Sequence, residues 1–180
     1  FNKDALRQWS LPKLINYGYD LNTGVWNESP GYAFGVMKDF IEFVTLFDQV
    51  LNIDLVEQLP VLKKAVLVIP EYLFPNGFTV GFGDTYHSRL PLESAYKLVA
   101  NAQKNNKAEQ EETYTRFIKT MQKLSGTSAA DSHTATGNFT SLFASAAVVL
   151  KESIEPGKVE DYVSPAFYAP NVSYFVQRSG

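Results

Sequence analysis

Asn27 and Glu28 have side chains suited to catalysis, and they directly precede a predicted helix. They lie in the stretch 24–32, directly before Ser29 and Pro30. Ser29 followed by Pro30 is typical of a helix start, because Ser caps helices and Pro fits the first helical position. The residues that follow are mostly apolar, so the polar pair is expected at the rim of a helical core. Polar side chains held at such a rim are candidates for binding or catalysis.

A second group of candidates lies in the loop 82–89. Tyr86 is a phenol close in sequence to the cationic Arg89 and is the best proton carrier of the group. His87 can act as a base or as a donor to a carboxylate near neutral pH. Arg89 offers a forked donor for carboxylate or sulfate, and Asp84 could orient Tyr86 or His87. These residue types make the loop a candidate for binding or proton transfer.

Each of these residues also has a purely structural interpretation. Asn27 and Asp84 are common in Asx turns, and a carboxylate such as Glu28 is stabilised at a helix N-terminus. Tyr86 could be one more buried aromatic residue, and His87 could be a surface residue. The residue types alone leave both interpretations open at each position.

Apolar periodicity predicts the helices that would position these loops. The strongest runs from Pro30 to Leu51, where i, i+3, i+4, i+7 spacing predicts a buried face. That face comprises Phe40, Phe43, Val44, Phe47, Val50 and Leu51. Further helices are expected from about Pro60, kinked or ended by Pro70, then over 91–103, 108–124 and, more weakly, 142–150. The short tract between the third and fourth helices predicts that they are antiparallel.

The pattern changes near the end of the chain, where residues 166–169 and 172–178 alternate as in a β-hairpin. A Pro-Asn pair stands at the turn between them. We therefore expect two parts: a helical segment over 1–155, and a linker with the first strands of a β domain over 156–180. Because the chain starts without Met or a signal-peptide pattern and stops after a strand, we interpret it as a fragment of a longer polypeptide.

Composition argues against several classes of protein. The 180 residues carry a formal net charge of −3 at pH 7, whereas a dedicated nucleic-acid binder is normally basic. No apolar run approaches the roughly 20 residues of a membrane span. The absence of cysteine excludes disulfides and thiolate metal sites but leaves the cellular compartment open. The polar residues, His133 included, show no metal-ligand spacing, so neither a metal site nor a cofactor is evident.

Three stretches together resemble the heparinase II/III-like polysaccharide lyases: 24–55, the loop 82–87 and the closing segment 167–178. The resemblance implies a mainly α fold, part of an (α/α) toroid of antiparallel helix pairs, followed by the first strands of an antiparallel β-sandwich. It also implies a cleft between the two domains and a periplasmic or secreted protein of bacterial type.

The chemistry that the resemblance implies is β-elimination at a uronic acid. Removal of the C5 proton adds charge beside a carboxylate. Such an enzyme therefore needs a donor to that carboxylate, a base at C5 and an acid at the leaving O4. In the family, a helix-start Asn or His acts on the carboxylate, and a Tyr further along the chain handles a proton. Asn27 and Tyr86, which are 59 positions apart, suit these roles.

We therefore predict a polysaccharide lyase that acts on an acidic, uronate-containing glycan. Asn27 and Tyr86 are the principal catalytic candidates, and Glu28 and His87 support them. Substrate contacts are assigned to Trp26, Tyr32, Asp84 and Arg89. Glu28 departs from the family pattern, since an anion repels the substrate carboxylate unless it is protonated or paired.

The expected partners are the acidic polysaccharide and the rest of the polypeptide, above all the β-sandwich domain. The resemblance places a second catalytic His beyond Gly180, so the fragment alone should have little activity, and a metal could be held there too. Two alternatives stay open: a non-catalytic glycan-binding helical module, or a glycoside hydrolase with Glu28 and Asp84 as its carboxylate pair. The sequence does not distinguish heparan-type, chondroitin-type and alginate-type polymers, endo from exo cleavage, or oligomeric states.

Overall fold

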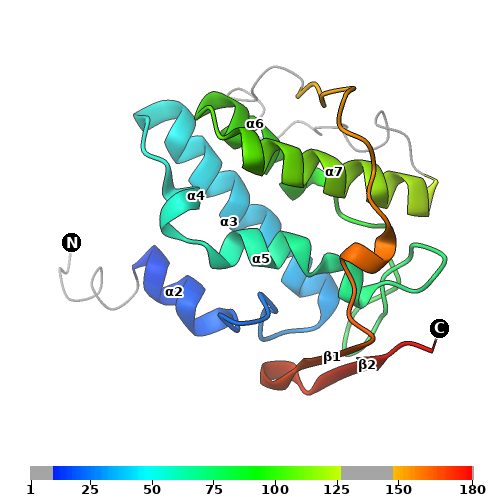
Figure 1. The fold of residues 1–180 in the computed structure, drawn as a ribbon. Helices are drawn as coiled ribbons and strands as arrows, with labels where there is room; N and C mark the ends of the chain where they lie inside the picture. The colour runs from blue at the N-terminus through cyan, green and yellow to red at the C-terminus, as the bar shows by residue number, and fades with distance from the viewer. Residues whose placement is uncertain (1–9, 127–147, 180) are drawn as a thin grey trace.

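A computed structural model describes residues 10–126 and 148–179. In this part of the chain, helices come first and a two-stranded antiparallel hairpin follows (Figure 1). The α-helices are α2 (Leu11–Gly18), α3 (Pro30–Leu51), α4 (Leu55–Gln58), α5 (Val61–Leu67), α6 (Glu93–Lys104) and α7 (Ala108–Ser125). The 3-10 helices are η1 (Ile69–Tyr72), η4 (Val159–Asp161) and η5 (Pro170–Val172), and the strands are β1 (Ala166–Ala169) and β2 (Tyr174–Gln177).

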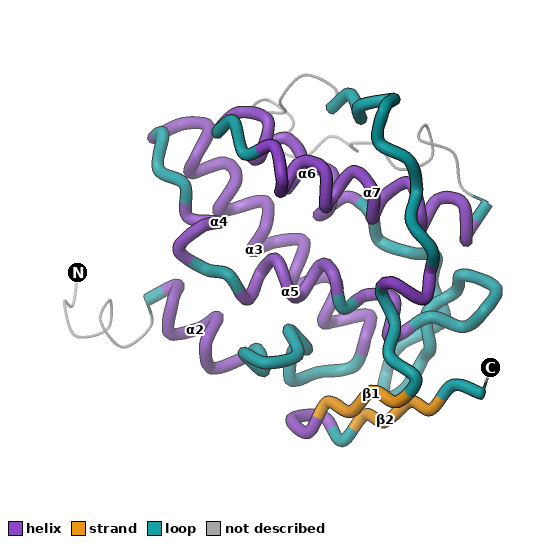
Figure 2. The backbone as a smooth tube through the Cα atoms, viewed as in Figure 1, coloured by secondary structure: helices purple, strands orange, loops and turns teal. Residues whose placement is uncertain are grey.

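The strongly periodic helices are confirmed. α3 has the predicted bounds, and α6 and α7 form the predicted antiparallel pair, joined by a short link at 105–107 (Figure 2). α5 ends before Pro70, which instead lies in the 3-10 turn η1, because Pro lacks the N–H that a continuing α-helix needs. The predicted helix 142–150 and the loop with His133 lie mostly outside the described residues, and 148–150 is not helical.

The predicted buried face of α3 is wrong in part. Phe43, Val50 and Leu51 are exposed, whereas Val44 is fully buried. The buried stripe lies on the adjacent side of the helix and runs through Ala33, Phe34, Met37, Ile41, Val44, Thr45 and Asp48. Because α3 carries apolar residues around much of its circumference, periodicity alone did not show which stripe faces the core.

The core lies where α3, α5, α6 and α7 pack together. Its fully buried side chains include Ile41, Leu62, Val66, Leu98, Val99, Phe117, Ile118 and Met121. The apolar residues Ala95, Tyr96 and Val99 of α6 and Tyr114, Phe117, Ile118 and Met121 of α7 are buried. Two short helices, α2 and α4, were not located in the sequence. The Ser10-Leu11-Pro12 start of α2 has the usual N-terminal signal, since Pro is tolerated in the first turn.

The hairpin packs directly on the helical part. Strand β1 pairs with β2 in a register that places Ala166 opposite Gln177. The ring of Tyr174 stacks on Tyr72 with centroids 5.1 Å apart, and its hydroxyl donates to the carbonyl of Glu71 at 2.9 Å. Burial raises the pKa of Tyr174 to about 12, so the hydroxyl stays a donor near neutral pH. These contacts join the hairpin to the turn after α5.

A charged clamp reinforces this junction. The carboxylate of Glu71 is buried, and its Oε2 accepts a hydrogen bond from Arg178 at 2.6 Å. Its other oxygen, Oε1, accepts from the backbone N–H of Ser164 at 2.9 Å. A buried carboxylate needs such donors, because an unpaired charge in the interior is costly. The hairpin therefore supplies partners that Glu71 requires.

Candidate functional site

The two candidate segments, 24–32 and 82–87, lie against each other at the start of α3. The hydroxyl of Tyr32 donates to Oδ2 of Asp84 at 3.5 Å. Gly31 lies so close to Thr85 that an added Cβ would be 2.8 Å from Thr85 Cγ2. The loop therefore rests on the first turn of α3. Asp84 contacts Tyr32 there.

Gly83 makes the second close approach between these segments. It has a φ of +65°, and an added Cβ would lie 3.1 Å from Ser29 Cβ. Gly adopts this left-handed conformation without the penalty that a side chain carries. Ser29 is the residue before α3 as predicted, but its side chain makes no capping hydrogen bond. The chain thus uses two glycines to bring the segments into contact.

Asn27 is held by contacts that are distant in the sequence. Its Nδ2 donates to the carbonyl of Tyr17 at 3.0 Å, and its Oδ1 accepts from Asn171 at 2.7 Å. Its backbone N–H donates to the carbonyl of Gly18 at 2.9 Å. These contacts differ from the Asx turn that was the structural alternative. The amide is exposed but fixed between α2 and the turn of the hairpin.

Glu28 is engaged by its neighbour Trp26. Trp26 Nε1 donates to Glu28 Oε2 at 2.6 Å. The indole ring also packs edge-on against Tyr19 and Phe40, with centroids 4.9 and 5.9 Å apart. Trp26 is half-buried as a result, with its ring shared between the core and the rim. The indole N–H is therefore one stabilising partner for the Glu28 carboxylate at this position.

Tyr86 is not the buried aromatic residue that its structural alternative required, because its side chain is 91% exposed. The next residue, His87, has Nδ1 2.9 Å from the carbonyl of Thr79, and its ring lies 5.6 Å from that of Phe74. Arg89 is exposed, and its backbone forms an isolated bridge with Phe78. The loop thus presents the phenol of Tyr86 to solvent, and the imidazole of the next residue is held by Thr79.

The hairpin contacts both candidate segments. Tyr174 stacks on Phe82, the first residue of the loop, with ring centroids 5.4 Å apart. Asn171, in the turn η5, donates to Asn27. Figure 1 shows this turn below the loop that joins α2 to α3. Asn171 was missed as a site residue, because an Asn in a turn gives no sign of its distant partner.

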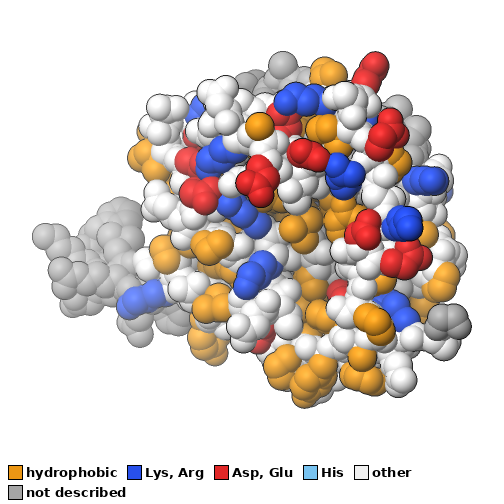
Figure 3. All heavy atoms as spheres, in the orientation of Figure 1, with side chains coloured by type: hydrophobic (Ala, Val, Ile, Leu, Met, Phe, Trp, Pro, Cys, Tyr) orange, Lys and Arg blue, Asp and Glu red, His pale blue; other side chains and the backbone are white. Residues whose placement is uncertain are grey.

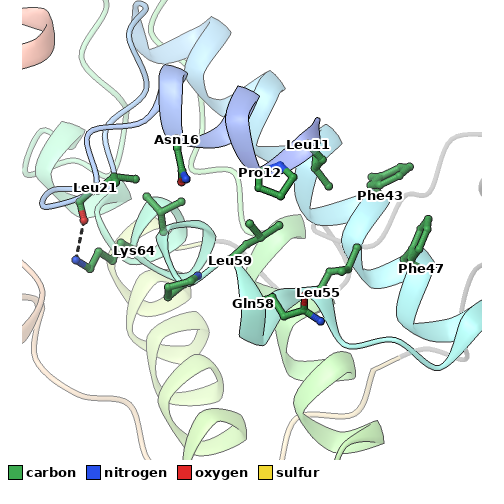
Figure 4. A pocket seen from close by; sticks show the side chains of 12 residues that line it. Leu11, Pro12, Asn16, Leu21, Phe43, Phe47, Leu55, Gln58, Leu59 and Lys64 are labelled. Atoms are coloured by element: carbon green, nitrogen blue, oxygen red, sulfur yellow. Dashed lines mark hydrogen bonds between the residues drawn. The ribbon is translucent and has the colours of Figure 1, made fainter. Parts of the chain in front are cut away.

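The pocket in Figure 4 lies elsewhere. It has a volume of about 490 Å³, is lined mainly by apolar side chains of α2, α3, α4 and α5, and includes Phe43 and Phe47. Lys64 lies at its edge and donates to the carbonyl of Leu21 at 2.8 Å. No residue predicted for the site lines this pocket. At the candidate site, the side chains of Asn27, Glu28, Asp84 and Tyr86 are exposed.

The surface view separates two kinds of side chain. Figure 3 shows acidic and basic groups mixed over the upper helices and apolar groups gathered over the hairpin. Among residues 10–126 and 148–179, no three His, Cys, Asp or Glu side chains gather as a possible metal site. Over the same residues, no helix is both long and apolar enough to cross a membrane.

Comparison with known families gives one match. The family described as the endo-acting ulvan lyase 2nd domain matches residues 22–165. This chain belongs to that family. Comparisons with curated proteins and with solved structures gave no match.

The family confirms the broader part of the sequence-based prediction. This ulvan lyase domain is part of a polysaccharide lyase family that acts on an acidic glycan. The match does not specify the heparinase II/III-like group that the sequence resembled. The matched residues include both candidate segments, whereas Asn171 lies beyond their end.

Proposed function

We propose that this domain forms one side of the catalytic site of an endo-acting ulvan lyase that cleaves its substrate by β-elimination at a uronate. The observation that carries the proposal is the contact between segments 24–32 and 82–87, through Tyr32 and Asp84, within a chain of the ulvan lyase family. This contact brings the stretches that carry Asn27 and Tyr86 to the same end of α3. An enzyme that acts outside the cell fits such a polymeric substrate.

In this proposal Asn27 binds the uronate carboxylate. One hydrogen of its Nδ2 is used by Tyr17, and an amide nitrogen carries two. The second hydrogen can therefore donate to a carboxylate oxygen without introducing a charge. As C5 loses its proton, negative charge builds on the carboxylate, so this hydrogen bond strengthens in the transition state.

Tyr86 handles the proton. In this proposal the oxygen of Tyr86 accepts the proton from C5, and the electron pair of that C–H bond becomes the C4–C5 double bond. The bond between C4 and O4 breaks at the same time, and the proton on Tyr86 passes to O4. Atoms and charge balance without any further reactant. Arg89 and His87 are assigned to binding the acidic chain, since both can donate to anionic groups.

The larger architecture belongs to the same proposal. We infer that α6 and α7 are one antiparallel pair of an (α/α) toroid and that the hairpin begins a β-sandwich. Residues 1–155 then form the helical segment, and residues 156–180 form the linker and the first strands of the β domain. A second proton-transfer residue, and any metal, would then come from the rest of the enzyme.

The test is an assay of the full-length enzyme with ulvan. A lyase produces a new C4–C5 double bond, which absorbs in the ultraviolet, and an endo-acting one lowers the viscosity early in the reaction. New reducing ends without that absorbance would instead show a hydrolase, and binding without cleavage would show a glycan-binding module. Strong lyase activity of the isolated 180 residues would refute the expectation that the fragment is nearly inactive.

A further inference from the structure

The turn of the hairpin carries a residue that the mechanism above does not use. Asn171 donates from Nδ2 to two acceptors, the carbonyl of Val25 at 3.0 Å and Oδ1 of Asn27 at 2.7 Å. Asn27 in turn donates to the carbonyl of Tyr17. The two side-chain amides therefore form a chain of hydrogen bonds that is closed at each end by a backbone carbonyl.

The two carbonyls determine which way both amides point. A carbonyl oxygen only accepts, so the end of Asn171 that faces Val25 must be its NH₂ group, and the same holds for the end of Asn27 that faces Tyr17. Both hydrogens of the Asn171 amide are used, one on each acceptor. Within the described ranges, one hydrogen of Asn27 Nδ2 has no partner, and it is the one assigned to the substrate.

We propose that Asn171 is a positioning residue for the lyase reaction and that it fixes the amide of Asn27 with a donor available to the uronate carboxylate. The inference rests on the proposed role of Asn27. Without Asn171, the Asn27 amide keeps its hydrogen bond to the Tyr17 carbonyl but loses the contact that fixes the tilt of the amide plane about that bond. The N–H assigned to the substrate then no longer has a fixed direction toward the uronate carboxylate.

The position of Asn171 in the fold gives this contact a second consequence. Asn171 and Asn27 are separated by 144 positions, and one lies in the hairpin while the other precedes α3. The orientation of a proposed catalytic amide in the helical part thus depends on docking of the hairpin. Tyr174 and Arg178 fasten the same hairpin to Glu71 without touching Asn27.

The variant that tests the inference is Asn171→Asp in the full-length enzyme, assayed with ulvan for kcat and KM. It replaces a double donor with an acceptor, so Asn27 Oδ1 would face an anion and the Asn27 amide would be displaced. We expect kcat to fall by about 10- to 100-fold, as when a reacting group is misplaced, with little change in KM. Asn171→Gln keeps the amide and should recover part of the activity.

Tyr174→Phe is the matched control. It removes the hydrogen bond to Glu71 from the same hairpin but keeps the ring that stacks on Tyr72 and Phe82. If Asn171 acts through Asn27, kcat is unchanged in this variant. Equal losses of kcat in both variants would mean that the hairpin needs only to dock, and this would overturn the inference. An unchanged kcat in folded Asn171→Asp would also overturn it, and Asn171→Ala replaces that variant if it unfolds.

Other outcomes separate this inference from the proposed function. A wild-type enzyme that forms no double bond overturns the proposed function itself. Wild-type activity in Asn27→Ala overturns the role of Asn27, and with it that of Asn171. If Asn27→Ala is inactive while Asn171→Asp has full activity, only the positioning role fails.

Discussion

The two ends of α3 are built in opposite ways. At its C-terminal end, buried Asp48 accepts from the side chains of Lys104, Asn101 and Asn105, which come from α6 and the link after it. At its N-terminal end, the segments around Asn27 and Tyr86 meet through longer and more exposed contacts. At one end the buried carboxylate of Asp48 is paired with donors of the protein, and at the other the polar side chains are exposed.

The difference shows how a single helix can serve both stability and function. Lys104 also reaches the backbone carbonyl of Asp48, so it satisfies a carbonyl at the end of α3 as well as the carboxylate. Groups used in this way are not available to a substrate. The exposed phenol of Tyr86 has the reverse character, because little of the fold depends on it.

Tyr86→Phe should have the largest effect, and only on activity. Loss of a proton-transfer group typically reduces the rate by about 10²- to 10⁴-fold. Because the side chain is exposed, the free energy of unfolding should change by less than about 0.5 kcal/mol. The measurements are kcat with ulvan and a urea unfolding curve. Tyr168→Phe, an exposed tyrosine of β1, is the control and should leave both unchanged. Full activity in Tyr86→Phe would remove Tyr86 from the mechanism.

Asp48→Ala should have the reverse pattern. It leaves the Lys104 ammonium and two amides without their shared acceptor. Because Lys104 is about one-third exposed and keeps the Asp48 carbonyl as an acceptor, we expect a loss of about 2 kcal/mol. Urea unfolding measures the loss, and kcat at a temperature where the variant is folded should be near the wild-type value. Asp39→Ala, an exposed change on the same helix, should cost little. Equal losses in the two variants would show that the buried cluster contributes no net stability.

Gly83→Ala tests the contact between the two candidate segments. The positive φ alone should cost about 1 kcal/mol, and the new Cβ would also crowd Ser29. We expect a fall in kcat, because the loop that carries Tyr86 must shift. Gly126→Ala is the matched control, since its φ is +64° and no atom of residues 10–126 or 148–179 lies within 4 Å of the added Cβ. It should lose similar stability and no activity. Similar kcat values in the two variants would mean that this contact does not position the site.

The sequence predicted the helices of this domain better than the candidate site. α3, α6 and α7 follow from apolar periodicity, because burial of one helical face leaves a local pattern. Asn27, Tyr86 and Asp84 were chosen from residue type and setting, and the contact between their segments was not visible in any local pattern. The pair Asn27 and Asn171 depends wholly on the tertiary fold. Asn is common in turns for local reasons, so the residue type does not indicate a distant hydrogen-bond partner.

The smallest predicted effect is a change of stability with pH near the C-terminal end of α3. Glu57 accepts from Lys107 at 2.7 Å, from Lys63 at 2.9 Å and from Gln110 at 3.1 Å. These hydrogen bonds, that of Lys107 first, lower the pKa of Glu57 to about 2. A depressed pKa in the folded state means that the contribution of Glu57 is complete above about pH 4.5 and is lost as the pH falls toward about 2.

Glu57→Gln should therefore cost stability near neutral pH, and its difference from the wild type should shrink through that acid range. Because the carboxylate is about half exposed, the solvent screens the pairs and the difference at neutral pH should be at most about 1 kcal/mol. Urea unfolding across the range measures it, with Glu155→Gln as an exposed control. A difference that stays constant with pH would mean that the substituted amide destabilises the fold through packing rather than through loss of charge. Lyase activity of Glu57→Gln at neutral pH should be normal. Glu57 stabilises the region at the C-terminal end of α3, whereas the candidate segments lie at its N-terminal end.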